Sequence, residues 1–270
     1  MPEFFARSRG ETESHGKMTA SFRQRVRSRE RLLGTFLKTA SYQTVDVLGL
    51  TGLDFVVIDA EQAPFDRNQL DVCVLAARAS QFPSLVRIPD DRPHTVLDVL
   101  DMGATGVLVP HAKYAPDVKR VLAAARYRGG VRGFSNSPRG GGYDQPPMKQ
   151  LVERADAESV VICQMEDREA VEAIDAIAAV DGVDCLFIGR ADLAVSYGVF
   201  DLSDVQVDAA VRHICGRSAA AGKAVGIFLG DAGELKRYEA LGVSLFVVGP
   251  DQSLLRAQAA ALAAQFGRAG

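Results

Sequence analysis

The stretch Phe55-Val56-Val57-Ile58-Asp59-Ala60-Glu61-Gln62-Ala63-Pro64 decides the fold and the position of the functional site. Its first four residues form a continuous apolar run, which is typical of a parallel strand buried on both faces. Asp59, Glu61 and Gln62 follow at once, and Pro64 ends regular strand pairing. In proteins of alternating strands and helices, polar side chains just past the C-terminal end of a strand bind ligands and substrates. The stretch therefore predicts a buried strand that delivers polar groups to a site.

The same pattern recurs along the chain from about residue 31 onward, with helical patterns in nearly all the intervals. The predicted strands are residues 32–36, 54–59, 84–88, 106–109, 160–165, 185–188, 224–228 and 244–248. Eight strand–helix units in about 240 residues favour an α/β protein of one domain, a closed (β/α)8 TIM barrel, over an open sheet. A long segment without regular pattern, residues 126–147, is rich in glycine and is expected to form a rim of the site.

The N-terminal segment differs from the rest in composition. Residues 1–28 are rich in Arg, Ser and Glu and lack the apolar core of a signal peptide. This composition predicts a disordered extension, so that the barrel domain spans residues 29–270. An alternative is that translation begins at Met18.

Composition narrows the class of protein. Apolar residues make up 47% and charged residues 24% of the chain, as in an ordinary soluble globular protein. The formal net charge of −3 gives no support for nucleic-acid binding, and no apolar run is long enough to cross a bilayer. The four cysteines lie in apolar segments without a Cys-x-x-Cys pair, which predicts buried, reduced thiols in a cytoplasmic protein.

Functional side chains of a barrel lie at the C-terminal ends of its strands, and eleven residues of this chain meet that condition. They are Asp59, Glu61, Gln62, Arg87, His111, Gln164, Glu166, Gly189, Arg190, Ala191 and Asp192. We expect them to converge on one mouth.

Glu166 and Asp192 are the predicted metal ligands. Carboxylates without nearby Cys or His favour a hard ion, so Mg²⁺ or Mn²⁺ is expected before Zn²⁺. The alternative is that each acid caps a helix. Arg87 ends a buried strand, where it either holds an anionic substrate group or pairs with Asp59 or Glu61.

Two further positions carry open alternatives. Gln164 is either a ligand-binding amide or a partner for neighbouring strand-end groups. The turn from Gly189 to Ala191 is able to offer backbone N–H groups to an anion at the start of a helix, although a lone glycine turn is a weak signal.

Taken together and in order, these residues resemble the HpcH/HpaI aldolase family of class II pyruvate aldolases, from about Leu33 to Phe266. The family includes enzymes that cleave 4-hydroxy-2-oxo-heptanedioate and 2-dehydro-3-deoxyglucarate. The stretches that carry the resemblance are Ile58-Asp59-Ala60-Glu61, Val86-Arg87, Asp101-Met102-Gly103, Leu108-Val109-Pro110, Tyr127 with Val131-Arg132-Gly133, Gln164-Met165-Glu166 and Phe187-Ile188-Gly189-Arg190-Ala191-Asp192-Leu193.

The resemblance implies a (β/α)8 barrel whose divalent metal is bound at Glu166 and Asp192 and chelates pyruvate or a longer 2-oxo acid. The arginine at position 87 would stabilise the enolate oxygen while the C–C bond to an aldehyde breaks. It also implies a hexamer, a dimer of trimers, in which the final helix is exchanged between subunits. The apolar stripe of that helix ends at Phe266.

Gln62 breaks the family pattern, because the related aldolases usually have a histidine there that pairs with the residue at position 59. Gln62 cannot take up and release a proton near pH 7. Loss of acid–base help slows a reaction by roughly 10²- to 10⁴-fold without removing the metal site. A second departure is Arg190, where many relatives have proline; it would add a cation beside the substrate and favour a longer or dianionic acid.

Three interpretations follow from Gln62. In the first, another group takes over the proton transfer: either His111 acts as the base, or Gln62 orients a water while Asp59 or a metal-bound hydroxide reacts. The alternative role for His111 is a structural hydrogen bond to a neighbouring residue. In the second interpretation, the protein catalyses a reaction that needs no such proton transfer. In the third, it binds 2-oxo acids with weakened catalysis. A CoA-thioester lyase is a further alternative, for which Arg132 and Arg139 are the available phosphate contacts. Our leading hypothesis is a metal-dependent aldolase.

Overall fold

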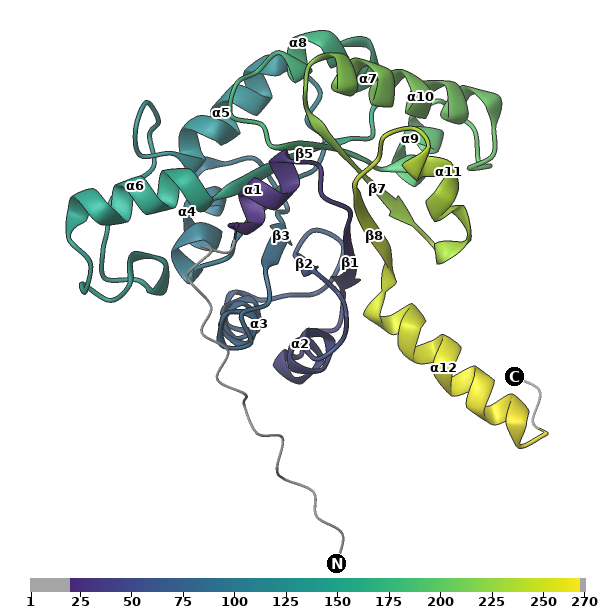
Figure 1. The fold of residues 1–270 in the computed structure, drawn as a ribbon, viewed down its shortest axis with the longest axis horizontal. Helices are drawn as coiled ribbons and strands as arrows, with labels where there is room; N and C mark the ends of the chain where they lie inside the picture. The colour runs from purple at the N-terminus through teal and green to yellow at the C-terminus, as the bar shows by residue number, and fades with distance from the viewer. Residues whose placement is uncertain (1–19, 268–270) are drawn as a thin grey trace, which may run out of the picture.

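Eight parallel strands close into a barrel in the computed structural model, which describes residues 20–267 (Figure 1). The strands follow one another around the barrel in chain order, and β8 pairs with β1. They are β1 (Leu32–Leu37), β2 (Phe55–Asp59), β3 (Ser84–Arg87), β4 (Gly106–Val109), β5 (Val160–Met165), β6 (Cys185–Ile188), β7 (Ala224–Leu229) and β8 (Leu245–Pro250). This confirms the predicted α/β class and the (β/α)8 barrel.

Helices occupy the intervals between the strands and surround the barrel (Figure 1). The α-helices are α1 (Phe22–Arg27), α2 (Tyr42–Gly49), α3 (Arg67–Ala79), α4 (Pro93–Met102), α5 (Ala115–Ala125), α6 (Met148–Glu158), α7 (Arg168–Glu172), α8 (Ile174–Ala178), α9 (Arg190–Ser196), α10 (Val205–Ala220), α11 (Leu235–Glu239) and α12 (Asp251–Gln265). Two short 3₁₀ helices, η1 (Arg139–Gly141) and η2 (Ala232–Glu234), lie in loops. Among the described residues, no helix has both the length and the apolar character that a membrane crossing requires.

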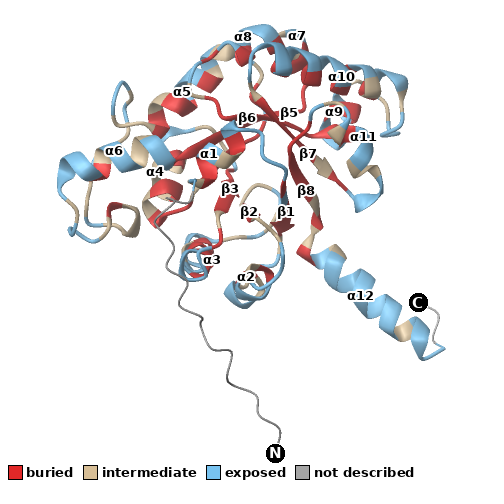
Figure 2. Cartoon of the chain, viewed as in Figure 1, coloured by how far each residue is buried: buried red, intermediate tan, exposed pale blue. Residues whose placement is uncertain are grey.

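Apolar side chains pack in two regions separated by the strands. One cluster fills the barrel interior and includes Phe55, Phe187 and Leu245, and the other lies between the strands and the outer helices. Strand residues are buried on both faces, so the strands are red along most of their length in Figure 2. This explains why the strands read as continuous apolar runs. All four cysteines are buried and free, as predicted.

Helix α1 corrects the predicted boundary at residue 28. Residues 1–19 of the predicted extension lie outside the described residues, but residues 22–27 form a capped helix. Phe22 packs on Phe55 at a ring distance of 5.4 Å, and Arg23 Nε donates to buried Asp184 at 2.8 Å. The helix therefore covers the N-terminal end of the barrel. Its polar composition concealed this role, although the capping box of Ser21 and Gln24 was a usable signal.

Helix α12 extends away from the barrel and is almost wholly exposed (Figures 1 and 2). Its first residue, Asp251, is the exception, because its carboxylate is buried against the loop that follows β1. Asp251 Oδ1 accepts the backbone N–H of Lys38 at 2.8 Å, and Oδ2 accepts that of Thr39 at 3.2 Å. The start of α12 thus fixes the backbone at the C-terminal end of β1.

Candidate active site

The C-terminal end of the barrel, which we call the mouth, collects polar side chains from five successive strands and a glycine from the sixth. Lys38 follows β1, Asp59 ends β2, and Arg87 ends β3. His111 lies two residues beyond β4, Glu166 directly after β5, and Gly189 directly after β6. Contacts among Asp59, Glu61, Arg87, His111, Glu166 and Gly189 bring these predicted residues together.

A buried ion pair joins the ends of β2 and β3. Arg87 Nε donates to Asp59 Oδ1 at 2.9 Å, and a terminal nitrogen of Arg87 donates to Asp59 Oδ2 at 2.7 Å. The Gln62 backbone N–H also donates to Asp59 Oδ1, at 3.0 Å. Burial opposes ionisation of Asp59, but the hydrogen bonds from Arg87 hold its pKa below the ordinary value. Of the two alternatives for Arg87, the structure shows the ion pair, which extends to Glu61 at 3.2 Å.

Lys38 is a mouth residue that the sequence analysis missed. Its Nζ lies 3.2 Å from Asp59 Oδ2, and its side chain is 30% exposed, whereas that of Asp59 is fully buried. The usable signal was its position, because Lys38 is the first residue after β1 and the other candidates were chosen by the same criterion.

Glu166 is a buried carboxylate held by two donors. Its Oε1 accepts the backbone N–H of His111 at 2.8 Å, and its Oε2 accepts a hydrogen bond from the amide of Gln164. His111 has a φ of 49°, a left-handed conformation in which its N–H points to Glu166. Burial raises the pKa of Glu166 to about 7, and the negative charge of Asp192 also raises it. Glu166 therefore lies close to the protonation equilibrium at neutral pH.

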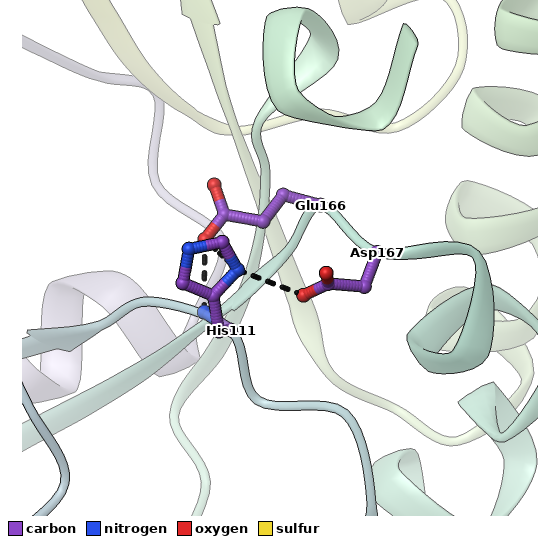
Figure 3. A group of neighbouring side chains, drawn as sticks. All are labelled: His111, Glu166 and Asp167. Carbon is purple, nitrogen blue, oxygen red and sulfur yellow. Dashed lines mark hydrogen bonds and ion pairs between the residues drawn. The ribbon is translucent and has the colours of Figure 1, made fainter. Parts of the chain in front are cut away.

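His111 forms a side-chain pair with Asp167, a second residue that the sequence analysis missed (Figure 3). His111 Nδ1 lies 3.0 Å from Asp167 Oδ2, and His111 Nε2 lies 3.9 Å from Glu61 Oε1. Lys113 Nζ contacts the other oxygen of Asp167 at 3.1 Å. Burial lowers the pKa of His111, but the hydrogen bond to Asp167 and the nearby carboxylates produce a net rise.

The chemistry of these donors suits a divalent cation. Among the described residues, ligand atoms of His111, Glu166 and Asp167 lie within 4.8 Å of one another. Asp192 is exposed in the first turn of α9 and acts on Glu166 through its charge. The buried Oε1 of Gln164, beside Glu166, has no hydrogen-bond partner among the residues described. A buried acceptor without a partner is costly, and a ligand donor or a cation would satisfy it.

A model of the family described as HpcH/HpaI aldolase/citrate lyase matches residues 32–257 of the chain. The chain belongs to this family. Relatives named 5-keto-4-deoxy-D-glucarate aldolase, from Enterobacter sp. (strain 638) and Salmonella paratyphi C (strain RKS4594), are 31% and 32% identical over 247 residues. Each alignment covers 91% of this chain and 96% of the relative. The similarity to these aldolases supports the conclusion that the chain is a lyase.

Solved structures agree with the HpcH/HpaI assignment. A family member from Burkholderia cenocepacia J2315 has a TM-score of 0.84 at 34% identity, covering 89% of this chain and 96% of its own. The citrate synthase SbnG has a TM-score of 0.82 at 31% identity, covering 92% of this chain and 98% of its own.

Arg190 differs from its predicted role. In place of a cation beside the substrate, the structure shows a buried guanidinium that donates to Glu234 at 2.7 Å and to the Tyr238 hydroxyl at 2.7 Å. Glu234 lies in η2, in the loop that follows β7, and neutralises this charge. At the start of α9, Arg190 and the exposed Ala191 thus have only backbone N–H groups to offer to a substrate anion.

Arg132 and Arg139, the phosphate contacts considered for a CoA thioester, are also paired. Arg132 donates to Asp101 at 2.9 Å, and its side chain is only 4% exposed. Arg139 binds the carboxylate of Asp71 through both terminal nitrogens. Each guanidinium is thus neutralised by a protein carboxylate, so within the described part of this loop neither arginine is an unpaired cation for a CoA phosphate.

Because Gly189 has no Cβ, the side chains of Glu166 and Gln164 are able to pack directly against its backbone. A Cβ at position 189 would lie 2.8 Å from Glu166 Oε2 and 2.9 Å from Gln164 Nε2. We expect Gly189→Ala to lower the free energy of unfolding by about 1–3 kcal/mol, as overpacked substitutions do. Chemical denaturation measures this. The control is Gly216→Ala in α10, which has open space around it and should gain about 0.5–1 kcal/mol. Equal stability of Gly189→Ala and wild type would contradict the tight packing.

Proposed function

We propose that this HpcH/HpaI protein is a class II, divalent-metal-dependent aldolase that cleaves or forms 4-hydroxy-2-oxo acids through a pyruvate enolate. The buried carboxylate of Glu166 carries this proposal. It is aligned by the His111 N–H and the Gln164 amide, and its pKa of about 7 makes it ready to exchange a proton for a cation. The names of the aldolase relatives support the same reaction class.

The charge balance of the mouth supports a divalent ion held by Glu166 and Asp192. Five carboxylates lie near three fixed cations, which leaves an excess of negative charge. These residues are Asp59, Glu61, Glu166, Asp167, Asp192, Lys38, Arg87 and Lys113. Oxygen donors favour Mg²⁺ or Mn²⁺. When bound, the ion would polarise the 2-oxo group of the substrate as a Lewis acid.

The residues of the chain account for the remaining requirements of cleavage. The C4 hydroxyl loses a proton, the C3–C4 bond breaks, and its electron pair passes into the enolate, which is finally protonated at C3. Arg87 supplies a fixed positive charge beside the developing enolate. Gln164 offers its unpaired buried Oε1 to the substrate. Asp59 is already saturated by Arg87 and the Gln62 N–H, so it serves to position Arg87.

His111 is the best-placed group for proton transfer in the absence of a histidine at position 62. Asp167 holds Nδ1, so that Nε2 faces Glu61 and the mouth. An imidazole oriented by a carboxylate on one nitrogen is a common arrangement for a general base. Gln62 donates its backbone N–H to Asp59, and this hydrogen bond does not require a titratable side chain at position 62.

Assembly through α12 is the other part of the proposal. Leu254, Leu255 and Leu262 are 45%, 74% and 56% exposed on a helix that leaves its own barrel, and Phe266 just beyond it is 79% exposed. Isolated apolar side chains are common at surfaces, but such a row indicates a partner surface. A second copy of the chain is the proposed partner, in a hexamer with exchanged α12 helices.

Turnover and metal binding provide the first test. With Mg²⁺ or Mn²⁺ the protein should release pyruvate from 4-hydroxy-2-oxo acids, and EDTA should abolish release. Glu166→Ala should weaken Mn²⁺ binding at least ~100-fold by calorimetry, because losing even an outer-shell partner costs 10–100-fold. Glu172→Ala, at a 63% exposed side chain, is the control and should leave binding unchanged.

Two outcomes would redirect the assignment. Unchanged Mn²⁺ affinity in Glu166→Ala would remove Glu166 from the metal centre. Binding of Mn²⁺ and pyruvate without turnover would favour the 2-oxo acid binding protein that Gln62 suggested.

Metal affinity should depend on pH through Glu166. Because the pKa of Glu166 is about 7, the group holds a proton below this pH, and the cation must displace it. We expect the Mn²⁺ affinity to fall about tenfold per pH unit below that value and to level off above it. Calorimetry in buffers of different ionisation enthalpy should show proton release at pH 6 and much less at pH 8. An affinity independent of pH between 5.5 and 8 would contradict this assignment.

The substitution His111→Gly tests the role of the imidazole separately from that of the His111 backbone N–H. Glycine keeps the N–H that Glu166 accepts and tolerates the φ of 49°. We expect kcat to fall roughly 10²-fold or more, with Mn²⁺ affinity nearly unchanged, and the acidic limb of the kcat pH profile to disappear. Asp167→Asn should shift that limb, because it alters the partner of Nδ1. Full kcat in His111→Gly would exclude the imidazole from proton transfer.

A further inference from the structure

Lys38 combines a fixed position with a partly exposed charge. It is the first residue beyond β1, and its ammonium group lies at the mouth, 3.2 Å from Asp59 Oδ2. Its backbone N–H is bound by the buried carboxylate of Asp251, so the loop that carries it is anchored. The side chain is 30% exposed, in contrast to the fully buried side chain of Asp59.

The other cation at this corner is already committed to protein groups. Arg87 binds both oxygens of Asp59 and lies 3.2 Å from Glu61, and its side chain is 8% exposed. An ammonium carries three N–H donors, and among the described residues Asp59 is the ion-pair partner found for Lys38. Asp59 does not depend on Lys38 for neutralisation, because Arg87 already binds it through two hydrogen bonds. Lys38 therefore retains donors for a ligand.

The distribution of charge across the mouth indicates which part of a substrate Lys38 meets. Glu166 follows β5 and Asp192 lies just beyond β6, so the carboxylates that suit a cation lie on one side. In a closed eight-stranded barrel in chain order, β1 and β2 lie across from β5 and β6. A 2-oxo acid whose 2-oxo end is bound near Glu166 and Gln164 would extend its other end toward Lys38.

We propose that Lys38 is a specificity-determining residue that binds a carboxylate at the end of the substrate remote from the 2-oxo group. This inference rests on the proposed aldolase function and assigns the recognition of the acceptor aldehyde to one side chain. The cation predicted for this purpose at position 190 is occupied by Glu234, whereas the ammonium of Lys38 is at the mouth.

The test compares two acceptors of the same chain length in condensation with pyruvate, succinic semialdehyde and butanal, which differ by a terminal carboxylate. Lys38→Met should lower kcat/KM for succinic semialdehyde about 10- to 100-fold, the usual value of a hydrogen bond to a charged group, mainly through KM. Activity with butanal should change less than about threefold, and Lys38→Arg should retain most of the preference. Lys149→Met, at an exposed lysine of α6, is the charge-matched control.

Failure of this inference differs from failure of the proposed function. Equal losses with both acceptors, or no loss with succinic semialdehyde, would overturn the role of Lys38 and make it only a partner of Asp59. If the wild-type protein shows no turnover, the aldolase proposal fails, and binding decides the role of Lys38. Calorimetry should then show tighter binding of 2-oxoadipate than of 2-oxohexanoate, with the difference lost in Lys38→Met; an unchanged difference would overturn the inference.

Discussion

The ion pair between Asp59 and Arg87 organises the mouth of this barrel. The two residues are partners in the register of β2 and β3 and end their strands side by side. Two hydrogen bonds join their side chains, and both residues are nearly inaccessible to solvent. Removing one partner of a buried pair leaves an uncompensated charge and typically costs about 3–5 kcal/mol. Glu61, Lys38 and the Gln62 N–H then take their positions around this pair.

The mouth is electrostatically divided as a result. Lys38 and Arg87, at the ends of β1 and β3, lie with Asp59 and Glu61, whereas Glu166, Asp167 and Asp192 follow β5 and β6 with Lys113 and His111 beside Asp167. Arg87 forms its ion pairs with Asp59 and Glu61, and only its longer-range charge reaches Glu166. Burial raises the pKa of Glu166 to about 7, although the hydrogen bonds from His111 and Gln164 lower it. This arrangement is the basis of our proposal of a divalent ion at Glu166 and a substrate carboxylate at Lys38.

Much of the fold was predictable because barrel strands are buried on both faces and their apolar runs are unbroken. All eight strands lie where the sequence places them, to within a residue or two at their ends. Helix α1 was not predictable in the same way, because its apolar contacts, Phe22 and Val26, are separated by Arg and Gln. Those two side chains gain their role only from the open end of the barrel that they cover.

The sequence by itself determined the barrel and the set of strand-end residues, since apolar periodicity and position after a strand are local properties of the chain. The partners of those residues were decided only by the tertiary structure. Arg190 and Lys38 are both cations just past a strand, yet Arg190 is buried and paired with Glu234, whereas Lys38 pairs with Asp59 and keeps a 30% exposed side chain. Charge pairing depends on which loops lie close together in the folded protein, and the distance between two loops is not a property of either segment alone.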